Sequence, residues 1–552
     1  MSKRKIDFKN LNFLFPNFEE YFNNTQPYET PEHPWNTLPD AEKAVKTILS
    51  FKDKDVLIVG DYDSDGTNAS AIVKIGLDLL GFTKVSIAIP DRFKDGYGLS
   101  QNMINRVLSL NPDLVITVDN GIVAVEQIKT LTDSGIEVVV TDHHEPLEDG
   151  TIPNCAAVVD QKRLDSNYSF KEICGAYVAY KIIQGCFELE NKPFPKEIFL
   201  PFATNASISD VMPVLNENRT LVKEGIKLIS ENPNQVYRAF FNLFPKVKQH
   251  NLKADDFGYY FGPIVNCDSR LTGNTDDVMK MFLNYNNKQI CEEQASKLFK
   301  LNQERKKLQT EQNKDCDTAI EHFYPDIENT KVPVVIAKEG FHHGLIGINA
   351  GHISEVYGVP AFVISVDKET GKAKGSARSI NEISALDMIR YCSDIVQGGG
   401  HKGAAGFSLE AKDIPLFRNK LIEYSNKFLS ADDYKITTDI ACELKFNDIN
   451  LTNYEKIKSR EPYGLQNEEP LFYGKFSLSS FSELSNNTVV LNFSDINDPT
   501  NMKVFSAISF SHSEIKDILE QYAIYEVIFK LNKNSFRGNE SVQILIEAIQ
   551  KI

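Results

Sequence analysis

The chain has 552 residues, of which 42% are hydrophobic and 25% charged, a balance that is typical of globular proteins and excludes a fibrous or disordered chain. Its formal net charge of −16 has the wrong sign for a general attraction to phosphate, so any contact with nucleic acid must be local. Neither a leader peptide nor a membrane span is recognisable and the eight cysteines never form C-x-x-C, so we expect a cytoplasmic protein with reduced thiols and no membrane contact.

The length predicts roughly three or four domains, and the first is of the α/β class. Short β-branched apolar runs alternate with amphipathic stretches, which predicts βαβ units and a parallel sheet. The expected strands are 56–60, 85–90, 114–119, 138–142 and 156–160. Helical, apolar sequence follows over residues 172–265, so we predict a doubly wound domain at 51–275 behind an N-terminal segment at 1–50.

Three further parts are expected after this domain. Residues 276–328 contain a long charged, glycine-free stretch, which predicts one long helix or a broken pair that bridges two lobes. Strand-like and helix-like segments alternate again over 329–430, indicating a second α/β domain. Short alternating strands such as YKITTDIACELKF and TVVLNFS then predict a small antiparallel barrel over 431–552, of the kind that binds oligonucleotides.

Acidic and imidazole side chains are concentrated directly after three predicted strands of the first domain. Ligands of open parallel sheets gather outside the carboxyl ends of the strands, and successive strands lie side by side. We therefore expect these side chains to converge on one crevice. They are Asp61, Asp63, Asp65, Asp119, Asp142, His143 and His144.

So many like charges in one crevice require shared protons or bound cations. Carboxylates with one or two histidines suit Mn²⁺ or Mg²⁺, and two such ions about 3.5 to 4 Å apart would serve phosphoester hydrolysis. Taken alone, Asp119 or Asp142 could equally be a helix cap. A histidine pair on a loop, taken alone, could simply be exposed to solvent. A calcium loop is excluded because Ile72 stands where its glutamate belongs.

The segments DYDSDG, VDNG and TDHH, in this order and spacing, resemble the first three motifs of the DHH phosphoesterases. SISDVMPVL is similar to the fourth motif, in which Asp210 would be the metal ligand. The resemblance implies two metal ions that share Asp119: one is bound by Asp61, Asp63 and Asp119, and the other by Asp65, Asp119, His143 and Asp210. It further implies that His144 lies beside the scissile phosphate and that Asp142 orients the histidines.

Later segments narrow the resemblance to RecJ-like exonucleases. CGAYVAYKII and PYGLQNEEPLF are similar to RecJ stretches, and GGGHKGAAG resembles the signature of the DHH-associated domain. By that resemblance His401 faces the metal ions across the cleft, and the glycines let backbone amides approach a phosphate. A glycine cluster of this kind is otherwise a tight turn. The resemblance also implies a pocket for a terminal 5′ phosphate and neighbouring DNA, with the candidates Arg92, Arg270, His342, Ser376 and Arg378.

Some positions depart from the family pattern. Phe341 stands where the family usually has tryptophan, and Gly351 and His352 stand where it has serine and arginine. The loss of a basic residue at position 352 puts part of the DNA path in doubt.

Taken together, the sequence predicts an exonuclease that removes mononucleotides from the 5′ end of single-stranded DNA in recombination, repair or replication. The cofactors are two divalent ions, Mn²⁺ or Mg²⁺. The expected partners are single-stranded DNA and a single-strand-binding protein or helicase, and the chain is expected to be a monomer. A phosphodiesterase for short oligonucleotides or cyclic dinucleotides is the alternative within this chemistry. An inactive DHH-type replication scaffold is the alternative of another class.

Overall fold

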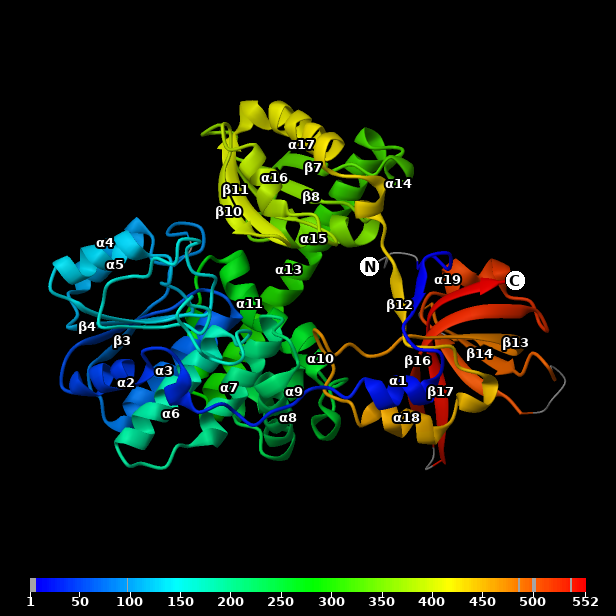
Figure 1. Cartoon of the computed structure of the whole chain (residues 1–552), viewed down its shortest axis with the longest axis horizontal. Coiled ribbons are helices and arrows are strands. Elements are labelled where there is room, and N and C mark those ends of the chain that lie inside the picture. Colours follow the sequence, from blue (N-terminus) through cyan, green and yellow to red (C-terminus); the bar gives the residue numbers. More distant parts are fainter. Residues whose placement is uncertain (1–5, 97, 485–486, 499–502, 537–538) are drawn as a thin grey trace.

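The computed structural model describes residues 6–96, 98–484, 487–498, 503–536 and 539–552. The chain forms two α/β lobes and a barrel, and helix α13 (Lys288–Phe323) connects the two lobes (Figure 1). The fold class expected from the sequence is confirmed in each of these parts.

The first lobe is built on a parallel sheet with the strand order β3, β2, β4, β5, β6. Its central strands consist of buried apolar residues, as expected for a sheet that is covered on both faces. The strands are β2 (Val56–Val59), β3 (Val85–Ala88), β4 (Leu114–Val118), β5 (Glu137–Thr141) and β6 (Ala157–Val159).

Helices pack on both faces of this sheet through two separate hydrophobic clusters. One cluster includes residues of α2 (Ala41–Ser50), α3 (Ser64–Leu80) and α6 (Gly175–Leu189). The other lies under α4 (Gln101–Leu110) and α5 (Val125–Asp133). Further helices extend the first cluster: α7 (Lys196–Ser209), α8 (Asn216–Glu231), α9 (Gln235–Leu243), the π-helix η3 (Phe257–Phe261), α11 (Gly262–Leu271) and α12 (Asp276–Leu283). The short helix α10 (Ala254–Asp256) directly precedes η3.

The bridging segment is a broken pair of helices, because α12 ends at Leu283 and α13 begins at Lys288. Helix α13 packs on α9, α11 and α12 in the first lobe and on α15 (Ile346–Tyr357) in the second. It is therefore the element that fixes the distance between the two lobes.

The second lobe has a mixed sheet in the order β10, β11, β9, β8, β7. Only β7 and β8 are parallel, and the other neighbours are antiparallel. The glycine-rich GGGHKGAAG forms the hairpin of β10 and β11, so its glycines lie in strands and in a tight turn. The elements are α14 (Ile327–Thr330), β7 (Val334–Glu339), β8 (Ala361–Val366), β9 (Lys372–Arg378), α16 (Ala385–Tyr391), β10 (Gln397–His401), β11 (Ala404–Glu410) and α17 (Ile414–Phe428).

The C-terminal strands close into a barrel in the order β13, β14, β15, β17, β16. All neighbours are antiparallel except β15 and β17, which pair in parallel. The strands are β13 (Phe472–Glu483), β14 (Val489–Ser494), β15 (Phe505–Ser509), β16 (Ile524–Phe536) and β17 (Asn539–Lys551), with α18 (Leu451–Lys458) and α19 (His512–Ile515) beside them.

One expected barrel strand is wrong. YKITTDIACELKF contains only the short strand β12 (Thr438–Ile440), which pairs in parallel with β1 (Leu11–Phe13) outside the barrel. The fifth barrel strand is β17 instead. Short-range patterning cannot reveal this exchange, because β12 finds its partner near the other end of the chain.

The N-terminal segment contacts both the barrel and the first lobe. Helix α1 (Phe18–Asn24) packs on the barrel, where the Phe18 and Phe472 rings lie 6.0 Å apart. The chain then runs to the first lobe, where Asn216 N–H donates to Tyr28 O. In the described part of the chain, no helix is long and apolar enough to cross a membrane, and all eight cysteines are free thiols.

Candidate metal centre and anion pocket

The turn after β2 brings its aspartates to the edge of the sheet. Asp63 caps helix α3, because its Oδ1 accepts hydrogen bonds from the N–H groups of Asp65 (2.9 Å) and Gly66 (3.1 Å). Gly66 lies against the backbone of Asp61, and a Cβ there would approach Asp61 O to 2.6 Å. The DYDSDG turn thus needs an aspartate as cap and a glycine for close packing, and it presents Asp61 and Asp65 on either side of the cap.

Asp119 follows β4 in a strained left-handed conformation, with φ of 61°. The N-terminus of α6 packs directly against it, and a Cβ on Gly175 would lie 2.8 Å from Asp119 Oδ1. The same helix end binds Asp65, whose two carboxylate oxygens accept the N–H groups of Gly175 and Ala176 at 2.7 Å each. Helix α6 therefore fixes two aspartates from different strands next to each other.

Asp142 and the two histidines follow β5. Asp142 Oδ1 accepts the N–H of His143 at 2.7 Å and pairs with His144 Nδ1 at 2.8 Å, and its Oδ2 accepts the N–H of Ile122. All of these contacts hold the turn and the His144 ring in place. The carboxylate of Asp142 points to the backbone and to His144, and the ring of His143 is turned toward other aspartates.

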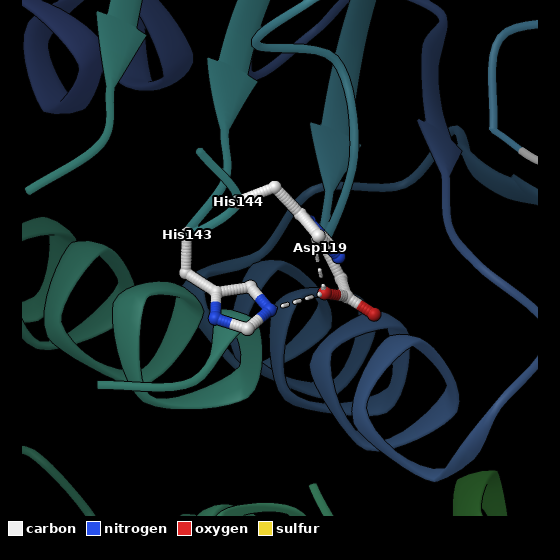
Figure 2. A group of neighbouring side chains, drawn as sticks. All are labelled: Asp119, His143 and His144. Atoms are coloured by element: carbon white, nitrogen blue, oxygen red, sulfur yellow. Dashed lines mark ion pairs between the residues drawn. The ribbon is translucent and has the colours of Figure 1, made fainter. Parts of the chain in front are cut away.

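The aspartates and histidines of the separate turns meet around His143 and Asp119. His143 Nε2 lies 3.1 Å from Asp119 Oδ1, 3.5 Å from Asp65 Oδ2 and 3.8 Å from Asp210 Oδ2. His144 Nδ1 lies 3.9 Å from Asp119 Oδ1, and Figure 2 shows both rings beside this carboxylate. Ligand atoms within 4.8 Å of one another form three groups: Asp61, Asp63 and Asp119; Asp65, His143 and Asp210; and Asp119, His143 and His144.

Burial of these like charges shifts their pKa values. Desolvation, followed by repulsion from neighbouring aspartates, holds the pKa of Asp61, Asp119 and Asp210 well above the ordinary value. The same two causes raise the pKa of Asp65 to about 6. Desolvation lowers the pKa of His143 to about 3. Desolvation also acts against protonation of His144, but the Asp142 carboxylate overcomes it and raises the pKa of His144 to about 9.

The donor set fits a divalent metal ion. Among the described residues, the buried oxygens Asp61 Oδ1 and Asp210 Oδ2 accept no hydrogen bond, and Asp119 Oδ1 meets only the two imidazoles. Buried carboxylate oxygens are costly unless a cation or a donor satisfies them. Oxygen ligands with one or two imidazoles are the preferred set of Mn²⁺ and Mg²⁺. Asp65 fits as well, because each of its oxygens keeps a lone pair after accepting an α6 amide.

The loop that follows Asp210 is held by a distant segment. Val214 N–H donates to Leu465 O at 2.9 Å, and a Cβ on Gly464 would meet Val214 Cγ2 at 2.4 Å. The buried Arg219 donates to the carbonyls of Glu461 and Pro462. The PYGLQN turn, which precedes the barrel, therefore packs next to the Asp210 loop. Sequence reasoning found this turn only as a similarity.

Arginines gather on the other side of the centre. The Arg92 guanidinium lies 4.8 Å from the centre of the Tyr62 ring, and Arg378 donates to Ser376 Oγ at 3.3 Å. Ser376 and Arg378 lie against Gly347 at the start of α15, where the helix dipole is positive. Desolvation, followed by repulsion from Arg92, lowers the pKa of Arg270 to about 9. None of these arginines forms an ion pair with a described carboxylate.

The two predicted histidines of the second lobe lie near these arginines. The His342 ring is 5.6 Å from the Phe93 ring, and His342 Nδ1 accepts the N–H of Gly344. His401 is exposed at the end of β10, and desolvation, followed by repulsion from Arg378, lowers its pKa. His144 of the first lobe also contributes to that shift, so the two imidazoles lie within electrostatic range of each other.

Two departures from the family pattern have structural roles here. His352 pairs with Asp317 of the bridging helix at 3.0 Å and so joins α15 to α13. Phe341 is buried, and its carbonyl accepts the Ser365 hydroxyl. Sequence reasoning missed two residues near the centre: Asn266, whose Oδ1 accepts the N–H of Ser64, and Arg305 of α13. A polar stripe at helical spacing on α13 was the available signal for Arg305.

Comparison with known protein families assigns all three globular parts. Residues 55–204 match the DHH family, N-terminal domain, residues 329–427 match the DHHA1 domain, and residues 440–548 match the RecJ OB domain. These matches lie within the first lobe, the second lobe and the barrel with its preceding turn, in that order.

Relatives of similar architecture are known. The single-stranded-DNA-specific exonuclease RecJ of Haemophilus influenzae is 28% identical over 94% of this chain and 92% of its own length. The RecJ exonuclease of Bacillus subtilis is 26% identical over 92% of this chain, but the chain spans only 63% of that relative. A crystal structure of RecJ from Thermus thermophilus in complex with Mn²⁺ is 25% identical, with a TM-score of 0.76, and the match covers 93% of this chain and 72% of that one.

Proposed function

Because the chain belongs to the RecJ-like branch of the DHH family, we propose that it is a metal-dependent exonuclease of single-stranded DNA. The observation that carries this proposal is that a cluster of buried carboxylates lies close to arginines that form no ion pair with a described carboxylate. The carboxylates suit metal ions and the arginines suit phosphates, and a nuclease needs both.

Two divalent ions, Mn²⁺ or Mg²⁺, would be held by Asp61, Asp63 and Asp119 on one side and by Asp65, Asp119, His143 and Asp210 on the other. When bound, they would supply the activated water and the charge neutralisation that phosphoester hydrolysis requires. The Thermus relative was crystallised with Mn²⁺, which supports this choice.

His144 is the proposed proton-bearing group at the scissile phosphate. Its side chain is 43% exposed, whereas that of His143 is 7% exposed, so only His144 can reach a substrate. Asp142 holds its Nδ1, and in the metal-free chain the Asp142 carboxylate outweighs desolvation and raises the pKa of His144 to about 9, which favours the protonated ring. A positive ring fixed in this way stabilises negative charge on a phosphoryl oxygen and can donate its proton to the leaving oxygen. His401 would approach the same phosphate from the second lobe.

The 5′ end of the strand would be recognised by Arg92, Arg270, Ser376 and Arg378 with His342 beside them. The positive start of α15 adds to the attraction for a terminal phosphate. The resemblance to RecJ exonucleases supplies the 5′ polarity. A phosphate site beside Tyr62, between two proposed metal ligands, would bring the first phosphodiester bond to the metal ions, so that mononucleotides are released. The barrel would bind the rest of the strand.

The other expected partners belong to this proposal as well. A cytoplasmic, monomeric enzyme would meet single-stranded DNA together with a single-strand-binding protein or a helicase, in recombination, repair or replication. Neither alternative function has an observation in its favour: an inactive scaffold has no use for the full ligand set, and a dinucleotide phosphodiesterase has none for the barrel.

The test is a degradation assay with purified protein and Mn²⁺ on 5′- and 3′-labelled single strands, on a duplex and on a dinucleotide. We expect mononucleotides from the 5′ end of the single strands only. Cleavage of the dinucleotide alone, or no metal-dependent cleavage at all, would contradict the proposal.

A further inference from the structure

A cavity of about 220 Å³ lies behind the proposed 5′-phosphate residues, and the bridging helix contributes an arginine to it. Arg305 of α13 and Arg270 of α11 both line the cavity. Asn266 forms part of the wall, and its Oδ1 accepts the N–H of Ser64, between two proposed metal ligands. Val211, which follows Asp210, is another lining residue and is 62% exposed. The cavity therefore adjoins the proposed metal centre.

Arg305 is buried without a compensating charge. Only 7% of the residue is exposed, and burial lowers its pKa. Its Nε donates to Asn302 Oδ1 at 2.8 Å and its Nη1 to Gln309 Oε1 at 2.7 Å, and both acceptors are neutral. Within the described ranges, no carboxylate pairs with this guanidinium. A buried cation in this state is unfavourable for folding unless an anion joins it.

A purely structural role does not explain Arg305. Both hydrogen-bond acceptors lie on α13 itself, one turn before and one turn after the arginine, so these bonds tie the helix to no other element. They hold the guanidinium in one orientation instead. Arg305 also repels Arg270, and that repulsion contributes to the low pKa of Arg270. Two like charges are thus kept at one cavity at a cost to stability.

We propose that Arg305 and Arg270 form an inner pocket that binds a phosphate group of the substrate strand. This inference rests on the proposed function and adds a specificity residue to it. Two arginines present planar forks of donors, which suit the tetrahedral oxygens of a phosphate. The phosphate is either the terminal monoester or the first internal diester, since the chemistry of recognition is the same.

The variant Arg305→Gln tests the pocket, because it removes the charge and the donor fork, while the glutamine amide can still donate to Asn302 Oδ1. With Mn²⁺ and strands of one sequence, we expect KM to rise about tenfold with a smaller change in kcat. A rise confined to 5′-phosphorylated strands identifies the terminal phosphate, and an equal rise on 5′-hydroxyl strands identifies an internal one. Arg305→Lys keeps the positive charge but lacks the planar fork of donors. Its KM should lie between that of the wild type and that of Arg305→Gln. Lys307→Gln removes an exposed charge from the same helix and should match the wild type.

A second readout needs no activity. Inorganic phosphate should raise the Tm of the metal-free wild type and raise that of Arg305→Gln less. Arg305→Gln alone should unfold no earlier than the wild type, because it removes an uncompensated buried charge. Equal KM values and equal phosphate stabilisation would overturn the proposal, as would a variant that is unfolded. If the wild type degrades no DNA but phosphate still stabilises it through Arg305, the proposed function fails and the pocket stands.

Discussion

The acidic centre and the arginine cluster lie close together, since the Arg92 guanidinium lies over the ring of Tyr62, but they are built in different ways. The acidic side comes from turns that directly follow strands β2, β4 and β5, with Asp210 added at the end of α7. The arginine side comes from separate elements, including the loop after β3, α11, α13 and β9. On the acidic side, buried oxygens of Asp61 and Asp210 accept no hydrogen bond from a described residue. On the arginine side, none of the arginines forms an ion pair with a described carboxylate. We infer that the acidic side favours bound cations and that the arginine side favours a bound phosphate. DNA and metal ions together would neutralise both sides.

The largest expected effect comes from breaking the acidic side at its shared ligand. Asp119→Asn removes the negative charge that both proposed ion sites use, and we expect exonuclease activity to fall by about 10³-fold or more. The metal-free Tm should not fall, because the change removes a charge that is buried and repelled. Asp133→Asn on the exposed end of α5 is the matched control. Activity within tenfold of wild type in Asp119→Asn would contradict the account.

A smaller loss of exonuclease activity is expected when the metal ligands are left intact but His144 loses its hydrogen bond with Asp142. Asp142→Asn removes the carboxylate that raises the pKa of His144 to about 9, so the ring becomes neutral at a lower pH. Activity at neutral pH should fall about 10- to 100-fold, and the alkaline limb of the pH–rate profile should move to lower pH. Asp149→Asn in the exposed loop serves as control. A loss of activity without any movement of the alkaline limb would exclude this role of Asp142.

Substitutions of the arginines should change the preference for 5′-phosphorylated strands more than they change kcat. Arg378→Gln removes one donor fork beside Ser376 and α15, and we expect about a tenfold loss in the preference for 5′-phosphorylated over 5′-hydroxyl strands. Arg390→Gln, on the exposed face of α16, should leave the preference unchanged. If Arg378→Gln weakened both substrates equally, the arginine would bind the strand elsewhere.

The smallest expected effect is the change in stability of the unsubstituted chain with pH, which reports on the acidic centre. The aspartates of the acidic centre have raised pKa values, about 6 for Asp65, so the folded chain binds their protons more tightly than the unfolded chain. Without metal, their ionisation therefore lowers stability as pH rises from about 4 through 6. Mn²⁺ should raise Tm by more at pH 8 than at pH 5, where protons compete for the ligands. Equal stabilisation at the two pH values would place Mn²⁺ elsewhere.

The two sides also differ in how much of them the sequence could predict. Asp61, Asp119 and His143 could be placed because each follows a strand whose pattern is visible, and parallel strands end at one edge of the sheet. Arg305 could not be placed, since a charged residue on a charged helix is usually solvated, and only the packing of α13 against α11 and α15 buries it. Similarity to a family supplied Arg92, Arg270 and Arg378 as candidates, but it did not show that none of them pairs with a carboxylate in the part of the chain that the structure describes.

The fold shows the same division between local and distant information. The parallel sheet, the helical bridge and the barrel class follow from patterns within short segments. The pairing of β12 with β1 does not, because Asn12 and Asp439 are joined across 427 residues of sequence. The contact of Val214 with Leu465, which supports the Asp210 loop, depends on the same kind of long-range packing.

The most direct test of the central claim is the number of Mn²⁺ ions bound per chain, measured by equilibrium titration and electron paramagnetic resonance. The account predicts two ions that share Asp119 and are magnetically coupled, and it predicts that Asp119→Asn weakens the binding of both. No binding by the wild type, or two ions that Asp119→Asn leaves in place, would contradict it.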